Sequence, residues 1–150
     1  MRVSLGAGIA FLIVLGAVFV PKALHYEAVD RPSVGLTKSG AGPFVVTVAS
    51  VNRAHPLSTY RAELNITNGS VPDDIAIGPL DRSGPWGDLD VNFSDADGNG
   101  VLSFGDTFTF AALAGPGGPW TYSLSIYFLP ADEDATAPCP CAVGRITFVA

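Results

Sequence analysis

Two stretches with alternating apolar and polar residues stand on either side of a short polar loop in the second half of the chain. Leu89, Val91 and Phe93 alternate up to the loop, and a second alternation runs from Phe108 to Ala112 after it. A period of two is typical of β-strands that bury one face. A loop between two such strands does not belong to a helix pair, so the sequence predicts that a β-structure is built around it.

The loop, Asp95–Asp106, carries oxygen-bearing groups at a regular spacing. Side-chain oxygens fall at positions one, three, five, nine and twelve, and a backbone carbonyl falls at seven: Asp95, Asp97, Asn99, Ser103, Asp106 and Val101. Calcium takes about six to eight oxygen ligands, so a short loop must turn sharply to supply them. Gly100 at position six permits that turn, and Leu102 at position eight is an apolar anchor.

This ligand order resembles that of an EF-hand-type calcium loop. The last ligand is Asp106, where a helix-flanked EF-hand carries glutamate, and dockerin-type loops are similar to this one in that respect. The alternative is a polar turn that binds no ion. Because the pattern continues through position twelve, the sequence favours Ca²⁺, held as a structural clamp between strands.

Strand-like segments recur at short intervals over residues 44–150. They are bounded by turn residues and comprise Phe44–Val51, Thr59–Thr67, Ile75–Ile77, Trp120–Leu129 and Ala142–Val149, besides the two that flank the loop. No helical period is found after residue 22. Short strands separated by Gly and Pro turns predict an all-β, immunoglobulin-like β-sandwich, with a closed barrel as the alternative.

The alternation also predicts which residues form the core. In Thr59–Thr67 the even-numbered residues are expected to face inward and the odd-numbered ones outward: Tyr60, Ala62, Leu64 and Ile66 against Arg61, Glu63, Asn65 and Thr67. Trp120 is in phase with Leu124 and Ile126, and we therefore expect it in the core as well.

The first part of the chain has a different composition. An uncharged run of eighteen residues, Val3–Val20, follows Arg2 and is closed by Pro21 and Lys22. This length is at the lower limit for a membrane-spanning helix. The sequence thus predicts a single hydrophobic helix in residues 1–22, retained as a transmembrane or filament-core segment, with a cleaved signal peptide as the alternative. Residues 23–43 then form a stalk, and the sandwich is anchored at the cell surface, outside the cell.

Composition and charge exclude several functions. Fourteen acidic against eight basic residues give a formal charge of -6, and no basic patch is present, so a nucleic-acid partner is not expected. No Ser-His-Asp arrangement or phosphate-binding glycine loop is found. The carboxylates are concentrated in and before the Asp95–Asp106 loop. We therefore expect a protein that is not an enzyme.

The two cysteines, Cys139 and Cys141, are separated by one proline. Three interpretations remain open: a strained local disulfide, bonds to other chains, and two thiolates that bind a metal. A metal lacks further ligands nearby, because the two histidines, His25 and His55, are distant in the sequence. The local disulfide is the preferred interpretation in an oxidising exterior.

Three asparagines satisfy the N-glycosylation pattern: Asn65, Asn68 and Asn92. Asn65 lies on the expected outer face and is the best acceptor among them. Trp86, in a Gly- and Pro-rich stretch, is a candidate surface aromatic for binding a glycan, although a loop tryptophan is also common in sandwiches that bind none.

The apolar N-terminal run, the Thr- and Val-rich body, and the loop that leads into Thr107-Phe-Thr-Phe110 together resemble archaeal type IV pilin-like surface proteins. The resemblance is detailed only over residues 89–110. It implies a filament or cell-surface subunit whose helix packs against copies of itself, or against the lipid bilayer, while the β-domain faces solvent. The function expected is structural or adhesive, with a carbohydrate- or ligand-binding module as the alternative.

Overall fold

The computed structural model describes residues 31–68, 72–113, 119–129 and 142–150. These residues form eight strands and one turn of 3₁₀ helix. In chain order the elements are β1 (Val34–Ser39), β2 (Phe44–Val51), η1 (Leu57–Thr59), β3 (Tyr60–Thr67), β4 (Pro72–Ile77), β5 (Asn92–Ser94), β6 (Thr107–Phe110), β7 (Thr121–Phe128) and β8 (Ala142–Val149). Except for β1, which lies in the predicted stalk, the strand bounds agree with the alternating segments of the sequence to within a few residues.

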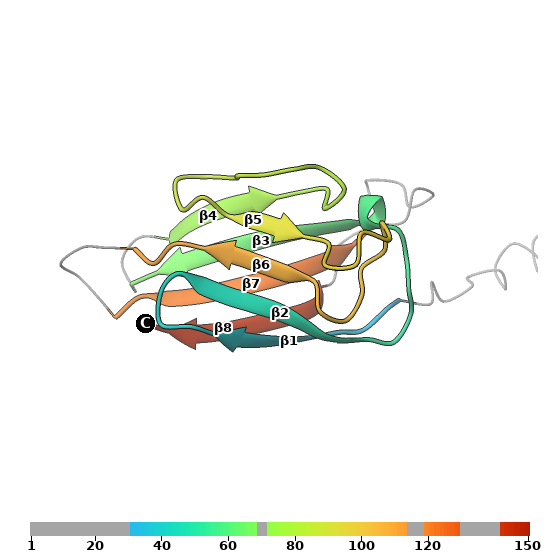
Figure 1. Cartoon of the computed structure of the whole chain (residues 1–150). Helices are drawn as coiled ribbons and strands as arrows, with labels where there is room; N and C mark the ends of the chain where they lie inside the picture. The colour runs from blue at the N-terminus through green and yellow to red at the C-terminus, as the bar shows by residue number, and fades with distance from the viewer. Residues whose placement is uncertain (1–30, 69–71, 114–118, 130–141) are drawn as a thin grey trace, which may run out of the picture. The chain divides into compact units, whose positions relative to one another are not determined.

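The strands form two four-stranded sheets, one with the order β1-β2-β6-β5 and the other with the order β4-β3-β7-β8. All neighbouring strands within each sheet are antiparallel. Figure 1 shows the first sheet in front of the second. This strand order is that of an immunoglobulin-like sandwich with one additional strand beside the third. The all-β prediction is confirmed, and the two separate sheets exclude the closed barrel.

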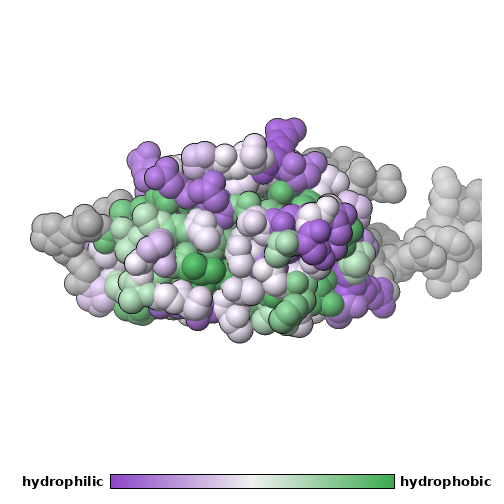
Figure 2. All heavy atoms as spheres, in the orientation of Figure 1, coloured by the Kyte–Doolittle hydropathy of each residue, from purple (hydrophilic) through white to green (hydrophobic). Residues whose placement is uncertain are grey.

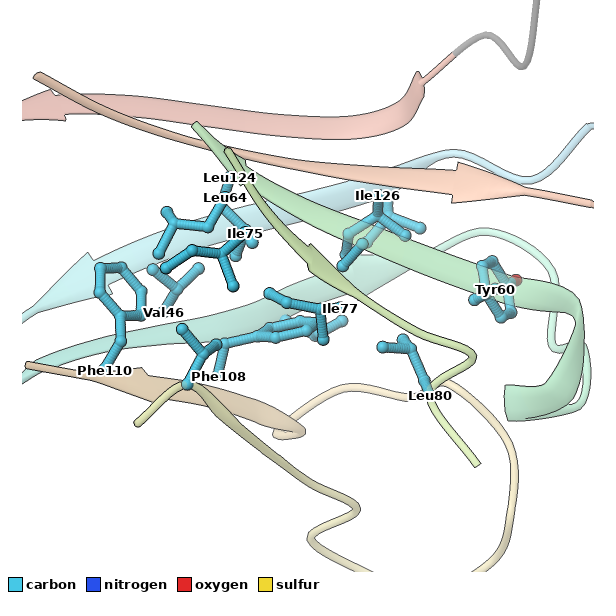
Figure 3. Packing of buried hydrophobic residues seen from close by; sticks show 14 of the residues in the cluster. Val46, Tyr60, Leu64, Ile75, Ile77, Leu80, Phe108, Phe110, Leu124 and Ile126 are labelled. Atoms are coloured by element: carbon cyan, nitrogen blue, oxygen red, sulfur yellow. The ribbon is translucent and has the colours of Figure 1, made fainter. Parts of the chain in front are cut away.

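The core lies between the two sheets and is built from the inward positions of the strands. Val46, Phe108 and Phe110 come from the first sheet, and Leu64, Ile75, Ile77, Leu124 and Ile126 come from the second (Figure 3). The predicted alternation of β3 is confirmed, because Tyr60, Ala62, Leu64 and Ile66 are buried while Arg61 is exposed. Trp120 is half-buried and packs against the same core.

One side of the sandwich is closed by contact between β1 and β8. A Cβ atom at Gly144 of β8 would lie 2.7 Å from the carbonyl oxygen of Val34 in β1, so a larger residue does not fit there without a shift of the backbone. β1 therefore belongs to the sandwich. The folded body begins before residue 44, where the sequence placed the end of a stalk.

The prediction of an N-terminal membrane-spanning helix is not retained. In the ranges that the structure describes, η1 is the only helical element, and no helix is long and apolar enough to cross a membrane. Residues 1–22, to which the helix was assigned, lie outside those ranges. Hydropathy alone suggested the helix, since an apolar run of this length is compatible with a span but does not establish one. The prediction that the protein is anchored at the cell surface depended on this helix, and it is withdrawn together with the helix.

Candidate metal centre

The Asp95–Asp106 loop connects β5 to β6 within the first sheet. Figure 1 shows the connection at the same end of the sandwich as η1, and Figure 2 shows hydrophilic side chains gathered over it. β5 ends at Ser94 and β6 begins at Thr107, so the ladder between the two strands holds the ends of the loop in place. The strands thus fix the positions of the first and last predicted ligands.

The loop brings three carboxylates together. One oxygen from each of Asp95, Asp97 and Asp106 lies within 4.8 Å of the other two. Two ligands on opposite sides of a calcium ion, each at about 2.4 Å, would be separated by about 4.8 Å. The three oxygens therefore have a spacing that a single Ca²⁺ ion can bridge.

Hydrogen bonds within the loop orient the first ligands. The two oxygens of Asp95 accept the N–H groups of Gly98 and Gly100, each at 2.8 Å. Gly100 has a φ of 74°, a left-handed conformation that glycine adopts without steric cost. The N–H of Gly100 points back at Asp95 because the chain turns there. This conformation explains why a glycine is suited to the sharp turn predicted at position six of the loop.

The middle of the loop continues in the same manner. Asp97 Oδ1 accepts the N–H of Asn99 at 3.3 Å, and Asn99 Oδ1 accepts the N–H of Val101 at 2.7 Å. Asp97 Oδ2 accepts the Asn99 side-chain amide at 2.7 Å and the hydroxyl of Ser103 at 3.4 Å. The side chains of Asp97, Asn99 and Ser103 therefore form one hydrogen-bonded network, and Asp106 joins it through the N–H of Ser103.

Val101 was predicted to contribute its backbone carbonyl. It forms an antiparallel bridge with Pro56, and the flanking residues make the two hydrogen bonds of that bridge: Leu57 N–H to Gly100 O at 3.0 Å, and Leu102 N–H to His55 O at 3.2 Å. The N–H and C=O of Val101 must then point away from Pro56, toward the inside of the loop. This is the direction that a ligand at position seven requires.

Asp106 is the most unusual member of the cluster, because it is a carboxylate with 0% of its surface exposed. Its two oxygens accept the N–H groups of Ala96 at 2.9 Å and Ser103 at 2.8 Å. Burial raises the pKa of Asp106 above its ordinary value, and the negative charges of Asp95 and Asp97 raise it further, against the lowering effect of the two N–H donors. Without a cation, the ionised form of Asp106 is disfavoured.

The pKa of Asp95 is shifted in the opposite direction. The N–H of Gly100 is the main cause that lowers it, and the N–H of Gly98 contributes in the same sense. Asp95 is only half-buried, so water also stabilises its charge. The loop thus holds one carboxylate that ionises readily beside a buried one that has no positively charged partner within the cluster. A divalent cation would satisfy both.

A feature that the sequence did not predict is the attachment of the loop to the segment between β2 and β3. The bridge at Pro56 fastens the loop to a connection that passes from one sheet to the other. Leu102, the predicted apolar anchor, is fully buried in the core. Nothing in residues 52–59 signals this pairing, because a bridge of one residue pair leaves no periodic pattern.

The remaining candidate residues lie elsewhere. The side-chain amide of Asn65 donates to the carboxylate of Asp74, and that of Asn92 donates to the carbonyl of Asp90 at 2.7 Å. Asn68 is exposed. Cys139 and Cys141 lie outside the described residues, so none of the three interpretations of the pair is tested.

Trp86, the candidate glycan-binding aromatic, is half-buried against the core and forms an isolated bridge with Val91. Its backbone N–H and C=O are both bonded to Val91, at 2.8 and 3.1 Å. The residue therefore packs a turn onto the sandwich.

No protein-family model matches this chain, and no curated protein matches it significantly. The interpretation of the site consequently depends on its geometry and chemistry.

Proposed function

We propose that this protein is a structural β-sandwich module that is stabilised by calcium. A single Ca²⁺ ion is held by the carboxylates of Asp95, Asp97 and Asp106 together with Asn99 and the carbonyl of Val101, and Ser103 supports the site through Asp97. The observation that carries the proposal is the fully buried carboxylate of Asp106, which has two other carboxylates within 4.8 Å.

The attachments of the loop indicate what the ion would do. On one side, the last ligand continues the pairing of β6 with β2, since the N–H of Val48 donates to the carbonyl of Asp106 at 2.8 Å. On the other side, the bridge at Pro56 holds the connection between the two sheets. An ion that fixes the loop therefore fixes both sheets at this end. No pair of helices flanks the loop, which favours a structural role over a calcium switch.

Thermal unfolding of the protein with calcium and with a chelator tests the proposal. A ligand that binds only the folded state stabilises it by about 2.7 kcal/mol at a concentration of 100 times its Kd. We expect Tm to rise by roughly 10 °C in calcium, given a shift of about 4 °C per kcal/mol for a domain of this size. Magnesium should give much less, because it demands a smaller octahedral site.

Two variants make this experiment specific. Asp95→Ala should abolish the difference between calcium and chelator, whereas Asp88→Asn, which removes an exposed carboxylate outside the cluster, should preserve it. Hydrogen exchange adds a local measurement, since the amides of Leu57 and Leu102 should exchange more slowly with calcium. Identical unfolding in calcium and in chelator would show that the loop is a polar turn.

A further inference from the structure

The outer face of the second sheet carries a groove that the proposed function does not use. It has a volume of about 570 Å³, and the residues around it come from β3, β4, β7 and β8 or directly follow them. This volume falls in the range of about 300–1,000 Å³ that is typical of small-molecule sites. No residue of the Asp95–Asp106 loop lines the groove, so it is independent of the candidate metal centre.

The groove arises from a contrast in side-chain size. Ala76 and Gly78 at one margin and Ala142 at the other are small, whereas Arg61 and Tyr127 between them are large. Arg61 and Tyr127 are opposite each other in the pairing of β3 with β7. A Cβ atom at Gly78 would lie 3.1 Å from Cγ of Arg61, which shows that the arginine stem runs along this glycine. The small residues thus leave open space beside the two large side chains at both margins of the sheet.

Two arginines make the groove locally cationic in a chain with a formal charge of -6. Arg61 projects from β3 and Arg145 from β8, on either side of β7. From the strand spacing and rise, their Cα atoms are separated by on the order of 12 Å. Because each side chain can extend about half that distance, both guanidinium groups can reach one ligand between them.

Arg145 is held in position by a neighbour. Its Nε donates to the hydroxyl of Ser125 at 3.0 Å, which draws the side chain from β8 across β7. Ser125 is 5% exposed although it is on the outer face of the sheet. The terminal N–H groups of Arg145 are not used in this bond. The arginine is thus oriented before any ligand arrives, which lowers the entropic cost of binding.

Arg61 and Glu63 are charged groups that are accessible to a ligand in the groove. Within the described part of the chain, neither side chain has a hydrogen bond or an ion pair. Both line the groove. Glu63 is opposite Ser125 in the pairing of β3 with β7, one row along from Arg61 and Tyr127. A carboxylate, two guanidinium groups and a phenol ring therefore line the groove together with the small residues at its margins.

We propose that this groove binds a carboxylate-bearing sugar of the uronate type. Guanidinium groups bind carboxylates with two parallel hydrogen bonds, which favours the acidic group of the sugar at Arg61 and Arg145. Glu63 accepts hydrogen bonds from ring hydroxyls, and the ring of Tyr127 offers an apolar surface to the sugar ring. The pairing of β3, β7 and β8 brings the residues of the groove together, so binding of the sugar does not require calcium.

Titration of the isotope-labelled full chain with D-glucuronate, followed by NMR, tests this proposal. D-glucose is the matched probe without the carboxylate. We expect saturable shifts at the amides of Arg61, Tyr127 and Arg145 with glucuronate, and at least tenfold weaker binding of glucose. The same titration with calcium and with chelator should give the same affinity, so failure of the metal site and failure of this site are distinguishable.

Variants locate the binding. Arg145→Gln and Arg61→Gln should each weaken glucuronate at least about tenfold, a change that corresponds to about 1.4 kcal/mol. Ser125→Ala should weaken it less, since the charge remains and only its orientation is lost. Arg82→Gln removes an exposed arginine outside the groove and should change nothing. Absence of saturable shifts, equal binding of glucose, or an equal loss in Arg82→Gln would each overturn the proposal.

Discussion

Two buried polar groups near the same end of the sandwich are accommodated in opposite ways. Asp106 and Tyr60 both have 0% of their surface exposed. Asp106 receives two backbone N–H donors, at 2.9 and 2.8 Å. The hydroxyl of Tyr60 has no hydrogen-bond partner among the described residues. One group is supplied with donors on every oxygen, and the other is left to its apolar surroundings.

The surroundings explain the difference. Tyr60 packs against Phe128 with ring centroids 5.4 Å apart and lies near the ring of His55 at 6.5 Å, at one end of the labelled cluster in Figure 3. Its ring contributes apolar burial that outweighs the lost hydrogen bond of a neutral hydroxyl. A carboxylate has no comparable apolar surface, and its charge costs far more to bury. The comparison is consistent with the proposed role of Asp106 as a ligand, whereas Tyr60 is placed for packing.

His55 lies between the two regions. Its ring contacts Phe128 with centroids 4.6 Å apart, and its carbonyl accepts the N–H of Leu102 from the Asp95–Asp106 loop. The candidate metal centre and the aromatic pair of Tyr60 and Phe128 are therefore joined through one residue of the connection between the sheets. The effect of a substitution in the Asp95–Asp106 loop on stability should depend on calcium, whereas the effect of a substitution at Tyr60 should not.

The largest effect is expected for Asp106→Ala. The variant loses a proposed ligand and leaves the N–H groups of Ala96 and Ser103 without their acceptor. Loss of the calcium contribution, about 2.7 kcal/mol at 100 times Kd, adds to about 1 kcal/mol or more for each unsatisfied donor. We expect a decrease of about 5 kcal/mol in the free energy of unfolding, measured with denaturant in calcium.

Chelator provides the control for Asp106→Ala. The wild-type protein should lose most of its advantage over the variant when calcium is removed, because relief of the buried charge then offsets the lost hydrogen bonds. A difference between the two proteins that is the same in calcium and in chelator would mean that Asp106 stabilises the loop without an ion.

A smaller effect with a different signature is expected for Leu102→Ala. Leu102 is fully buried, and truncation of a buried leucine costs about 2–5 kcal/mol. We expect about 3 kcal/mol, because the site is near a loop that can partly collapse. The loss should be present with chelator as well as with calcium, and the rise of Tm in calcium should remain. If Leu102→Ala abolished the rise of Tm in calcium, Leu102 would be needed for calcium binding as well as for packing.

The two kinds of site differ in how far the sequence predicts them. The predicted ligands from Asp95 to Asp106 lie within twelve consecutive residues, so spacing alone places them together. The outward positions of β3 were also predicted, since alternation decides which face Arg61 occupies. That Arg61 and Arg145 flank one groove was not predictable, because it depends on the register of β3 and β8 with β7. Register is set by long-range pairing that a single strand does not encode.

The N-terminal prediction failed for a related reason. An apolar run is defined by composition, and composition does not distinguish a membrane span from other uses of apolar residues. The alternating segments succeeded because burial of one face imposes a period of two on each strand. The sequence therefore predicts what local geometry requires, and is silent on Pro56, whose pairing with Val101 joins distant parts of the chain.

The smallest effect at neutral pH is expected for Tyr60→Phe. Removing a hydroxyl that has no partner within the described residues should change the free energy of unfolding by less than about 1 kcal/mol. Burial raises the pKa of Tyr60 from 10.0 to about 12. The unfolded chain thus loses its tyrosine proton at a lower pH than the folded protein. Stability from this group is complete below pH 10 and is lost as the pH rises from there toward 12.

Denaturant unfolding at pH 8 and at pH 11 measures this difference. Wild-type protein should lose about 1 kcal/mol more than Tyr60→Phe between the two values, because one unit of pKa corresponds to about 1.4 kcal/mol. Tyr127→Phe is the matched control, since Tyr127 is on the outer face of the same sheet and is only half-buried. An equal alkaline loss in wild type and Tyr60→Phe would mean that the hydroxyl finds a partner or water. In that case Tyr60 would resemble Asp106 in being supplied with hydrogen bonds, and the contrast between the two buried groups would be one of charge alone.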